Sequence, residues 1–212
     1  MIDLYTWHTP NGRKVSIMLE EIGMDYKVFP INIAKDEQFQ PHFLKISPNN
    51  RIPAIIDKDN NNYSLFESGA ILMYLAEKSG KLINKSNSDD YFRTMEWLMW
   101  QMGGVGPMFG QVHHFVKYNK GKSAYAEERY SKEARRLYGV MDKRLSQSQY
   151  IAGKDYSIVD ISIWPWTARF DWQEIDLNEF PNVARWYKEM IDRPAVQKGW
   201  LVPQNDQLIP TI

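Results

Sequence analysis

The first 80 residues alternate between apolar stretches typical of strands and one clear helical repeat. Apolar residues dominate 2–7 and 26–31, which predicts a strand in each stretch. Between them, four apolar residues recur with the spacing i, i+3, i+4 and i+7: Val15, Met18, Leu19 and Ile22. This spacing predicts an amphipathic helix over 13–22, which Gly23 ends in the C′ position. A strand, a helix and a second strand predict a βαβ unit with a right-handed crossover.

The next segment predicts a hairpin followed by a helix. Residues 54–56 are an apolar run typical of a buried strand, and the three asparagines at 60–62 are a turn signal before a strand at 63–66. A helical pattern then opens at 67–68 and ends near Lys78. The order βαβ followed by ββα is that of a thioredoxin-like domain.

The sequence changes character at a polar segment rich in Ser and Asn, 81–90, which is the best candidate for a linker. Long helical patterns follow over 91–114, 124–145 and 183–191. No convincing strand pattern is found there. We therefore expect an α/β thioredoxin-like domain over 1–80 and an all-α helical domain over 91–212.

One capping signal stands out in the second half of the chain. Ser157 and Asp160 have the S-x-x-D spacing of a capping box, with Asp in place of the usual Glu, directly before an apolar run. We interpret this pair as a device that starts a helix, and we assign no chemistry to it.

Charge and hydropathy exclude several classes of partner. The 26 Lys and Arg residues balance the 26 Asp and Glu residues, and no basic run exceeds 117–122, whereas binding to nucleic acid usually requires a basic stripe. No apolar run reaches the roughly 20 residues of a membrane span. The first residues, MIDLYTW, lack the layout of a secretory signal. We expect a cytoplasmic protein with neither a nucleic-acid partner nor a membrane partner.

The chain contains no cysteine, which removes disulfide bonds, thiolate metal ligands and a protein thiol nucleophile. His113 and His114 are adjacent, so on a helix they point about 100° apart and cannot bind one ion together. His8 and His42 have no partner at ligand spacing. The glycines of 103–110 match neither the Rossmann nor the P-loop spacing. We expect no metal and no nucleotide.

Three places remain as candidates for binding a ligand. Residues 9–12 form a helix start, whose N–H groups and about half a positive charge favour an anion. Residues 49–53 precede a buried strand, and a proline there is often cis in a thioredoxin-like order, leaving the backbone of Ile52 to pair with an extended peptide. Ser68 begins a second anion-receptive helix. Each alone reads as a cap or a turn; together they predict a peptide-sized groove.

Four stretches of the chain resemble the cytosolic glutathione transferases: TPNGRKVSIMLEEIGMDY, FLKISPNNRIPAIID, SLFESGAILMYLAEK and YSIVDISIWPW. The first two, together with GGVGPMFGQVHHF and the run Glu128–Arg129–Tyr130, resemble more narrowly the bacterial Nu class. The resemblance covers nearly the whole chain and implies a thioredoxin-like N-terminal domain, a C-terminal helical bundle and a homodimer. Members of this class are similar to glutathione-dependent disulfide reductases in activity.

The resemblance implies catalytic roles for Thr9, Asn11 and Arg129. Thr9 would donate its hydroxyl to the sulfur of glutathione, where other classes use Tyr, Ser or Cys. Asn11 would contact glutathione at the same helix start, and Arg129 would point a cation into the sulfur region. Without the resemblance, Arg129 belongs to a charged helical run over 127–136 that would ordinarily be a solvated face.

The resemblance also implies a set of glutathione-binding residues. Ile52 would pair with the cysteinyl backbone, while Glu67 and Ser68 would hold the γ-glutamyl end. Gln38 and Arg51 would meet the glycyl carboxylate or a second glutathione. Taken by itself, Arg51 reads equally well as a surface ion-pair residue.

These expectations describe an enzyme that binds one or two glutathione molecules as co-substrate and reduces a small disulfide. Because the protein has no thiol, the attacking sulfur must belong to glutathione. Two alternatives remain: a transferase that conjugates electrophiles, and a non-catalytic glutathione-binding regulatory module. The sequence Thr9–Pro10–Asn11 departs from typical transferases and argues against ordinary conjugation.

Overall fold

The computed structural model describes residues 1–85 and 87–212, which divide into two compact units. The first unit comprises Met1–Lys81 together with Ile191–Ile209. The second comprises Leu82–Met190 together with Pro210–Ile212. The first continuous segment of the first unit therefore ends at Lys81, within the predicted linker at 81–90. Ser86 of this linker lies outside the described residues.

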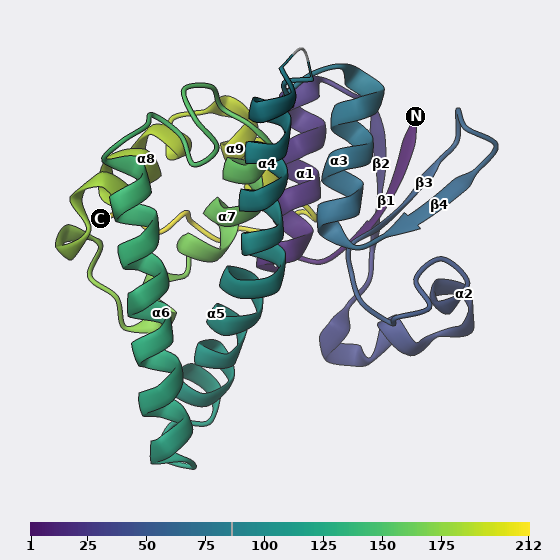
Figure 1. Cartoon of the computed structure of the whole chain (residues 1–212). Helices are drawn as coiled ribbons and strands as arrows, with labels where there is room; N and C mark the ends of the chain where they lie inside the picture. Colours follow the sequence, from purple (N-terminus) through teal and green to yellow (C-terminus); the bar gives the residue numbers. More distant parts are fainter. Residues whose placement is uncertain (86) are drawn as a thin grey trace. The chain divides into compact units, whose positions relative to one another are not determined.

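A four-stranded mixed sheet in the order β2-β1-β3-β4 forms the centre of the first unit (Figure 1). The strands are β1 (Ile2–Thr6), β2 (Tyr26–Pro30), β3 (Ala54–Asp57) and β4 (Tyr63–Phe66). β2 runs parallel to β1, whereas β1 with β3 and β3 with β4 are antiparallel pairs. The predicted βαβ unit, the hairpin and the thioredoxin-like order are confirmed.

Two capped helices, α1 (Pro10–Ile22) and α3 (Ser68–Ser79), pack against each other in this unit (Figure 1). Helix α1 begins at Pro10, within the helix start predicted at 9–12 and three residues before the apolar repeat over 13–22, because Thr9 caps it and Pro10 suits its first turn. Gly23 ends it at a φ of 68°, in the left-handed region that glycine adopts without strain. A short α2 (Pro41–Leu44) and two 3₁₀ turns, at Ile33–Lys35 and Glu37–Phe39, connect β2 to β3.

The C-terminal segment differs from the predicted division, because α9 (Pro194–Trp200) packs against α1 and belongs to the first unit. The Ser16 hydroxyl donates to the Gly199 carbonyl at 2.7 Å. A Cβ at Gly199 would lie 2.6 Å from the backbone of Ile17, so only glycine permits this close approach. The Arg13 guanidinium stacks 3.3 Å above the centre of the Trp200 ring. These contacts join residues more than 180 positions apart, which no local pattern reveals.

The second unit is helical, and its segments are α4 (Ser88–Trp100), α5 (Gly106–Val112), α6 (Ala124–Leu145), α7 (Ile158–Thr167) and α8 (Pro181–Ile191). The predicted helix at 91–114 is one helical run in which two π-helical turns, Gln101–Val105 and His113–Tyr118, flank α5. Pro107 has no N–H to donate, so one backbone carbonyl of the preceding turn loses its helical hydrogen-bond partner. In the described part of the chain, no helix is long and apolar enough to cross a membrane.

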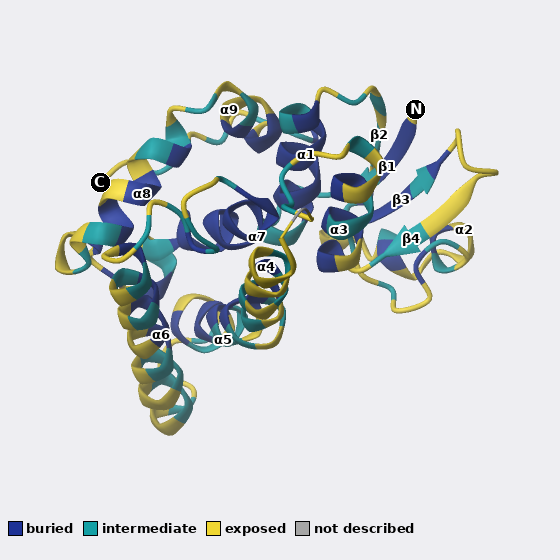
Figure 2. Ribbon diagram, turned by 45° about the horizontal axis from the view of Figure 1, so that its top comes forward, coloured by how far each residue is buried: buried dark blue, intermediate teal, exposed yellow. Residues whose placement is uncertain are grey.

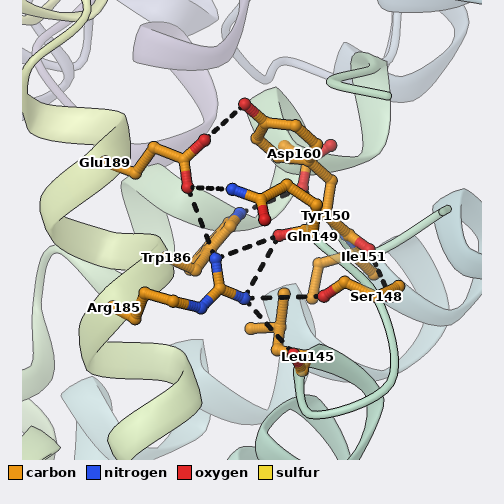
Figure 3. Close-up of polar contacts among 9 residues, drawn as sticks. All are labelled: Leu145, Ser148, Gln149, Tyr150, Ile151, Asp160, Arg185, Trp186 and Glu189. Carbon is orange, nitrogen blue, oxygen red and sulfur yellow. Dashed lines mark hydrogen bonds and ion pairs between the residues drawn. The ribbon is translucent and has the colours of Figure 1, made fainter. Parts of the chain in front are cut away.

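Helix α7 is buried along its whole length and is dark blue in Figure 2. The predicted capping box is present. The Ser157 side chain accepts a hydrogen bond from the Asp160 N–H, and the Asp160 side chain accepts one from the Ser157 N–H. The second carboxylate oxygen of Asp160 accepts bonds from Ile151 N and Trp186 Nε1, both at 3.0 Å (Figure 3). One buried carboxylate therefore joins α7, the loop before it and α8.

Candidate functional site

Four segments of the chain meet at one edge of the sheet in the first unit. Thr6, at the end of β1, pairs with Pro30 at the end of the parallel strand β2. Tyr5 pairs with Ala54, the first residue of β3, and Ala54 pairs with Phe66, the last residue of β4. The chain therefore leaves β1, β2 and β4, and enters β3, at the same edge. The segments that do so carry most of the predicted glutathione residues: Thr9, Asn11, Gln38, Arg51, Ile52, Glu67 and Ser68.

The start of α1 is built from the sequence Thr9–Pro10–Asn11–Gly12. The Thr9 Oγ1 accepts a hydrogen bond from the Gly12 N–H at 3.2 Å, so its own hydrogen is directed to a different atom. A Cβ at Gly12 would lie 2.0 Å from the Trp7 carbonyl oxygen, and only glycine lets the helix begin this close to the end of β1. The half-buried Asn11 occupies the first turn, at the positive end of the helix dipole.

The loop before β3 presents backbone rather than side chains. The Ile52–Pro53 bond is cis, as expected. The Ile52 side chain packs against the apolar cluster of Ile31, Phe43 and Ala54. Its backbone makes no hydrogen bond with any described residue, which suits it to pair with an extended ligand.

Arg51 precedes this backbone segment and is exposed. Its Nη1 donates to the carbonyl and to the side-chain oxygen of Asn50, at 3.2 and 2.8 Å. The Arg51 carbonyl accepts a bond from the Ser47 hydroxyl at 2.8 Å. The guanidinium is therefore held at the surface beside the loop, where it can reach an anion in solution.

The start of α3 has an unusual backbone. Glu67, the N-cap residue, has a φ of 71°, a region that costs a non-glycine residue about 1–3 kcal/mol and that clusters at functional sites. Asn49 Nδ2 lies 3.4 Å from the Glu67 carboxylate, which links the loop before β3 to the end of β4. Ser68 follows as the first residue of the helix and is 4% exposed. A helix start with a serine in this position is suited to bind a carboxylate.

Lys14 is a member of this site that the sequence analysis missed. Its side chain is 1% exposed, and its Nζ lies 3.2 Å from the Ser68 Oγ. Burial lowers the pKa of the Lys14 ammonium to about 7, and the nearby Glu67 carboxylate opposes this shift. The position of Lys14 in the helical repeat is a signal for its burial that was missed. Lys14 lies four residues before Met18 and therefore on the apolar face of the predicted helix.

Gln38 has a buried acceptor without a partner. The residue is 8% exposed, and its Nε2 lies 3.4 Å from Asp36 Oδ1. Its Oε1 is buried and accepts no hydrogen bond from the described residues. Because buried polar atoms are nearly always satisfied by protein, water or ligand, this oxygen can accept a hydrogen bond from a water molecule or a ligand.

Arg129 belongs to the second unit, where it is exposed on α6. It lines a cavity of about 590 Å³ together with further residues of α5 and α6, among them Met108, Tyr125, Tyr130, Lys132 and Arg136. The other two cations of this cavity are paired, Lys132 with Glu128 and Arg136 with Glu133. Among residues 1–85 and 87–212, Arg129 makes no ion pair of its own, but its charge acts on the Glu133 carboxylate: the hydrogen bond from Arg136 lowers the pKa of Glu133, and Arg129 lowers it further.

No group of three His, Cys, Asp or Glu side chains within the described residues could hold a metal ion. His113 is instead part of an aromatic cluster in the second unit, with ring centres 5.6 Å from Trp166 and 5.3 Å from Trp172. Burial lowers its pKa to about 4. It is therefore a neutral packing residue near pH 7.

Comparison with known proteins identifies the family. The N-terminal domain of glutathione S-transferases matches residues 1–77, and the C-terminal domain matches residues 104–194. The chain belongs to the glutathione S-transferase family. Among its curated relatives, the disulfide-bond oxidoreductase YfcG of Escherichia coli is 46% identical over 208 residues, which cover 96% of each chain.

Solved structures of this family are equally similar. A glutathione transferase family member from Pseudomonas fluorescens, with two glutathione molecules bound, has a TM-score of 0.89 and 44% identity over 94% of this chain and 92% of its own. A glutathione transferase from Pseudomonas putida, with one glutathione disulfide bound per subunit, has a TM-score of 0.89 and 43% identity, covering 95% and 91%. The predicted family and fold are confirmed.

Proposed function

We propose that this chain is a glutathione-dependent disulfide-bond oxidoreductase that works with the thiolate of bound glutathione. Two observations taken together support the proposal. The chain is 46% identical to the disulfide-bond oxidoreductase YfcG along nearly its whole length, yet it contains no cysteine. A glutaredoxin-type enzyme attacks its substrate with its own thiolate. This chain cannot do so, because it has no cysteine. The reacting sulfur must therefore come from glutathione.

The start of α1 stabilises the thiolate in this proposal. The Thr9 oxygen accepts a hydrogen bond from the Gly12 N–H, so the Thr9 hydroxyl can at the same time donate its own hydrogen to a sulfur bound at the start of the helix. This hydrogen bond and the helix dipole both favour the charged form of the thiol. Asn11 contributes its side chain in the same turn. Arg129 would add a cation to the sulfur region.

The remaining residues hold the rest of the tripeptide. Ile52 pairs through its backbone with the cysteinyl residue of glutathione, because its own N–H and C=O make no bond with the described chain. Glu67 and Ser68 hold the γ-glutamyl end at the start of α3. Gln38 and Arg51 meet the glycyl carboxylate or a second glutathione, and the buried, unpartnered Oε1 of Gln38 supports a ligand contact there.

The proposed reaction has two thiol–disulfide exchanges. The thiolate of the first glutathione attacks one sulfur of the substrate; the substrate S–S bond breaks, a mixed disulfide forms, and one substrate thiolate leaves and takes up a proton. The thiolate of a second glutathione then attacks the glutathione sulfur of the mixed disulfide. The second substrate thiolate leaves and takes up a proton, and glutathione disulfide forms. Relatives that hold two glutathione molecules or one glutathione disulfide support this sequence.

Two assays test the proposal against its alternatives. We expect the purified protein to reduce hydroxyethyl disulfide with glutathione and to conjugate chlorodinitrobenzene only weakly. Dominant conjugation would instead indicate an ordinary transferase, and no activity in either assay would indicate a binding module. Treatment with iodoacetamide, followed by its removal before glutathione is added, should leave the activity intact because the chain has no thiol to alkylate.

We further propose that the protein is a homodimer, acts in the cytoplasm and takes a small disulfide as substrate. Phe92 and Met99 are 66% and 54% exposed, and they lie seven positions apart on α4, so they share one face of the helix. Exposed apolar side chains that gather on one face are typical of interfaces. Light scattering should give the mass of a dimer, and the double substitution Phe92→Ser, Met99→Ser should give a monomer. A wild-type mass equal to the 25.0 kDa of the single chain would contradict this assembly.

A further inference from the structure

We propose that Lys14 is a positioning residue for the γ-glutamyl end of glutathione, and that it takes up a proton when the γ-glutamyl carboxylate binds beside Ser68. This inference rests on the proposed function, since it concerns the same glutathione site. It adds a residue that lies behind the ligand-contacting surface and couples ligand affinity to pH.

The Lys14 side chain lies next to Ser68, the first residue of α3. Lys14 reaches from α1, and its Nζ lies 3.2 Å from the Ser68 Oγ; the two residues are 1% and 4% exposed. A lysine ammonium can donate hydrogen bonds but cannot accept them. The Ser68 oxygen therefore accepts, and its hydroxyl hydrogen points away from Lys14. Protonated Lys14 thus both orients Ser68 and adds positive charge behind the N–H groups of α3.

The protonation state of Lys14 depends on what lies near it. Burial disfavours the ammonium and lowers its pKa to about 7, while the Glu67 carboxylate acts in the opposite direction. The other charged side chains on α1 and on the elements packed against it are Arg13, Glu20, Glu21, Glu77, Lys78, Arg193 and Lys198. Of these, Lys78 pairs with Asp57, and Arg193 pairs with Glu21.

A bound carboxylate changes this balance. At pH 8, a group whose pKa is about 7 is only about one-tenth protonated. A second carboxylate next to a buried ammonium favours the charged form strongly, because the surrounding dielectric is low. If the ligand raises the pKa of Lys14 by about two units, binding at pH 8 takes up close to one proton. The same binding at pH 6 takes up almost none, because Lys14 is already protonated.

Isothermal titration calorimetry with S-methylglutathione measures this proton directly. The methylated sulfur has no proton to lose, so thiol ionisation does not contribute. Titrations in buffers with different ionisation enthalpies should give an uptake of about 0.5–1 proton at pH 8 and close to zero at pH 6. The dissociation constant should rise about tenfold between pH 6 and pH 8. These measurements use the wild-type protein and do not depend on the folding of a variant.

Three variants assign the proton to Lys14. Lys14→Met replaces the ammonium with an apolar group of similar length; it should abolish the difference in uptake between pH 6 and pH 8 and weaken binding at pH 6. Lys14→Arg keeps a permanent charge, so it should bind with little dependence on pH. Lys27→Met makes the same chemical change at an exposed residue of β2 and should behave as the wild type.

Two outcomes would overturn the inference while leaving the glutathione site in place. One is tight binding by the wild type at pH 8 without proton uptake. The other is an uptake that persists in Lys14→Met, which would assign the proton to the amino group of the ligand. If the wild type fails to bind S-methylglutathione at any pH, the proposed glutathione site is wrong, and the role of Lys14 is overturned with it.

Discussion

Removing the hydroxyl of Thr9 should lower turnover strongly. A hydrogen bond to a charged group contributes about 1.5–3 kcal/mol. If this energy is lost only where the sulfur carries charge, Thr9→Ala should lower kcat by about 10- to 150-fold at pH 7. The dipole and remaining amides of α1 still act on the sulfur, so the smaller value is expected.

Thr9 also caps α1, and this second role must be separated from the first. Its Oγ1 accepts the Gly12 N–H, and the loss of such a cap costs about 0.5–2 kcal/mol of stability. Thr9→Ser keeps both the cap and the hydroxyl donor, so it is the matched control. It should retain most of the activity and most of the melting temperature.

The pH dependence distinguishes the electrostatic role from a structural one. In Thr9→Ala, the thiol of bound glutathione should titrate closer to its reference pKa of about 8.5. The ratio of wild-type to variant kcat for hydroxyethyl disulfide should therefore be largest near pH 7 and shrink toward pH 9, where both thiols are ionised. Full turnover of the alanine variant at pH 7, or a ratio that does not change with pH, would refute the reasoning.

Three further predictions concern binding and stability. Ser68→Ala and Glu67→Ala should raise the dissociation constant for glutathione in calorimetry and leave kcat nearly unchanged, because they remove binding at a remote end of the ligand; unchanged affinity in both would contradict the γ-glutamyl assignment. Gly12→Ala should lower the melting temperature sharply, since its Cβ would lie 2.0 Å from a backbone oxygen, whereas Gly103→Ala, with open space around its Cβ, should not. Burial raises the pKa of Asp160 to about 6, above its unfolded value, so the stability contributed by its protonation is present below about pH 4 and is lost as the pH rises through 6. Melting curves of Asp160→Asn should lack this slope and show a loss of roughly 1–3 kcal/mol at pH 7; a slope as steep as that of the wild type would contradict the assignment.

Local signals made much of the first unit predictable from the sequence. The start of α1 follows from Thr9 and Pro10, and its end follows from Gly23, because caps act on their own helix and leave a fixed mark in the sequence. The hairpin around 60–62 and the capping box before α7 have the same kind of local cause. The edge of the sheet where the site lies then follows from the strand order.

The parts that could not be predicted depend on distant contacts. The pattern of 194–200 predicts neither its place in the first unit nor its packing on Ile17, because that contact is set by close approach at Gly199. The π turn at Gln101–Val105 interrupts a pattern that fits an ordinary helix equally well. Lys14 was missed although it lies on the apolar face of the predicted helix, because lysine is almost always exposed. Its contact with Ser68 becomes visible only when α3 lies beside α1.

The central claim, that bound glutathione supplies the reacting thiolate, is tested most directly by the ultraviolet absorbance of that thiolate as a function of pH. Two sources of stabilisation, the helix dipole and one charge-assisted hydrogen bond, together account for about 2.7 kcal/mol, or about two pKa units. The thiol of glutathione bound to the wild-type protein should therefore titrate with a midpoint near 6.5, about two units below its reference value of about 8.5. A midpoint at the reference value, in a protein that still reduces disulfides, would contradict the account.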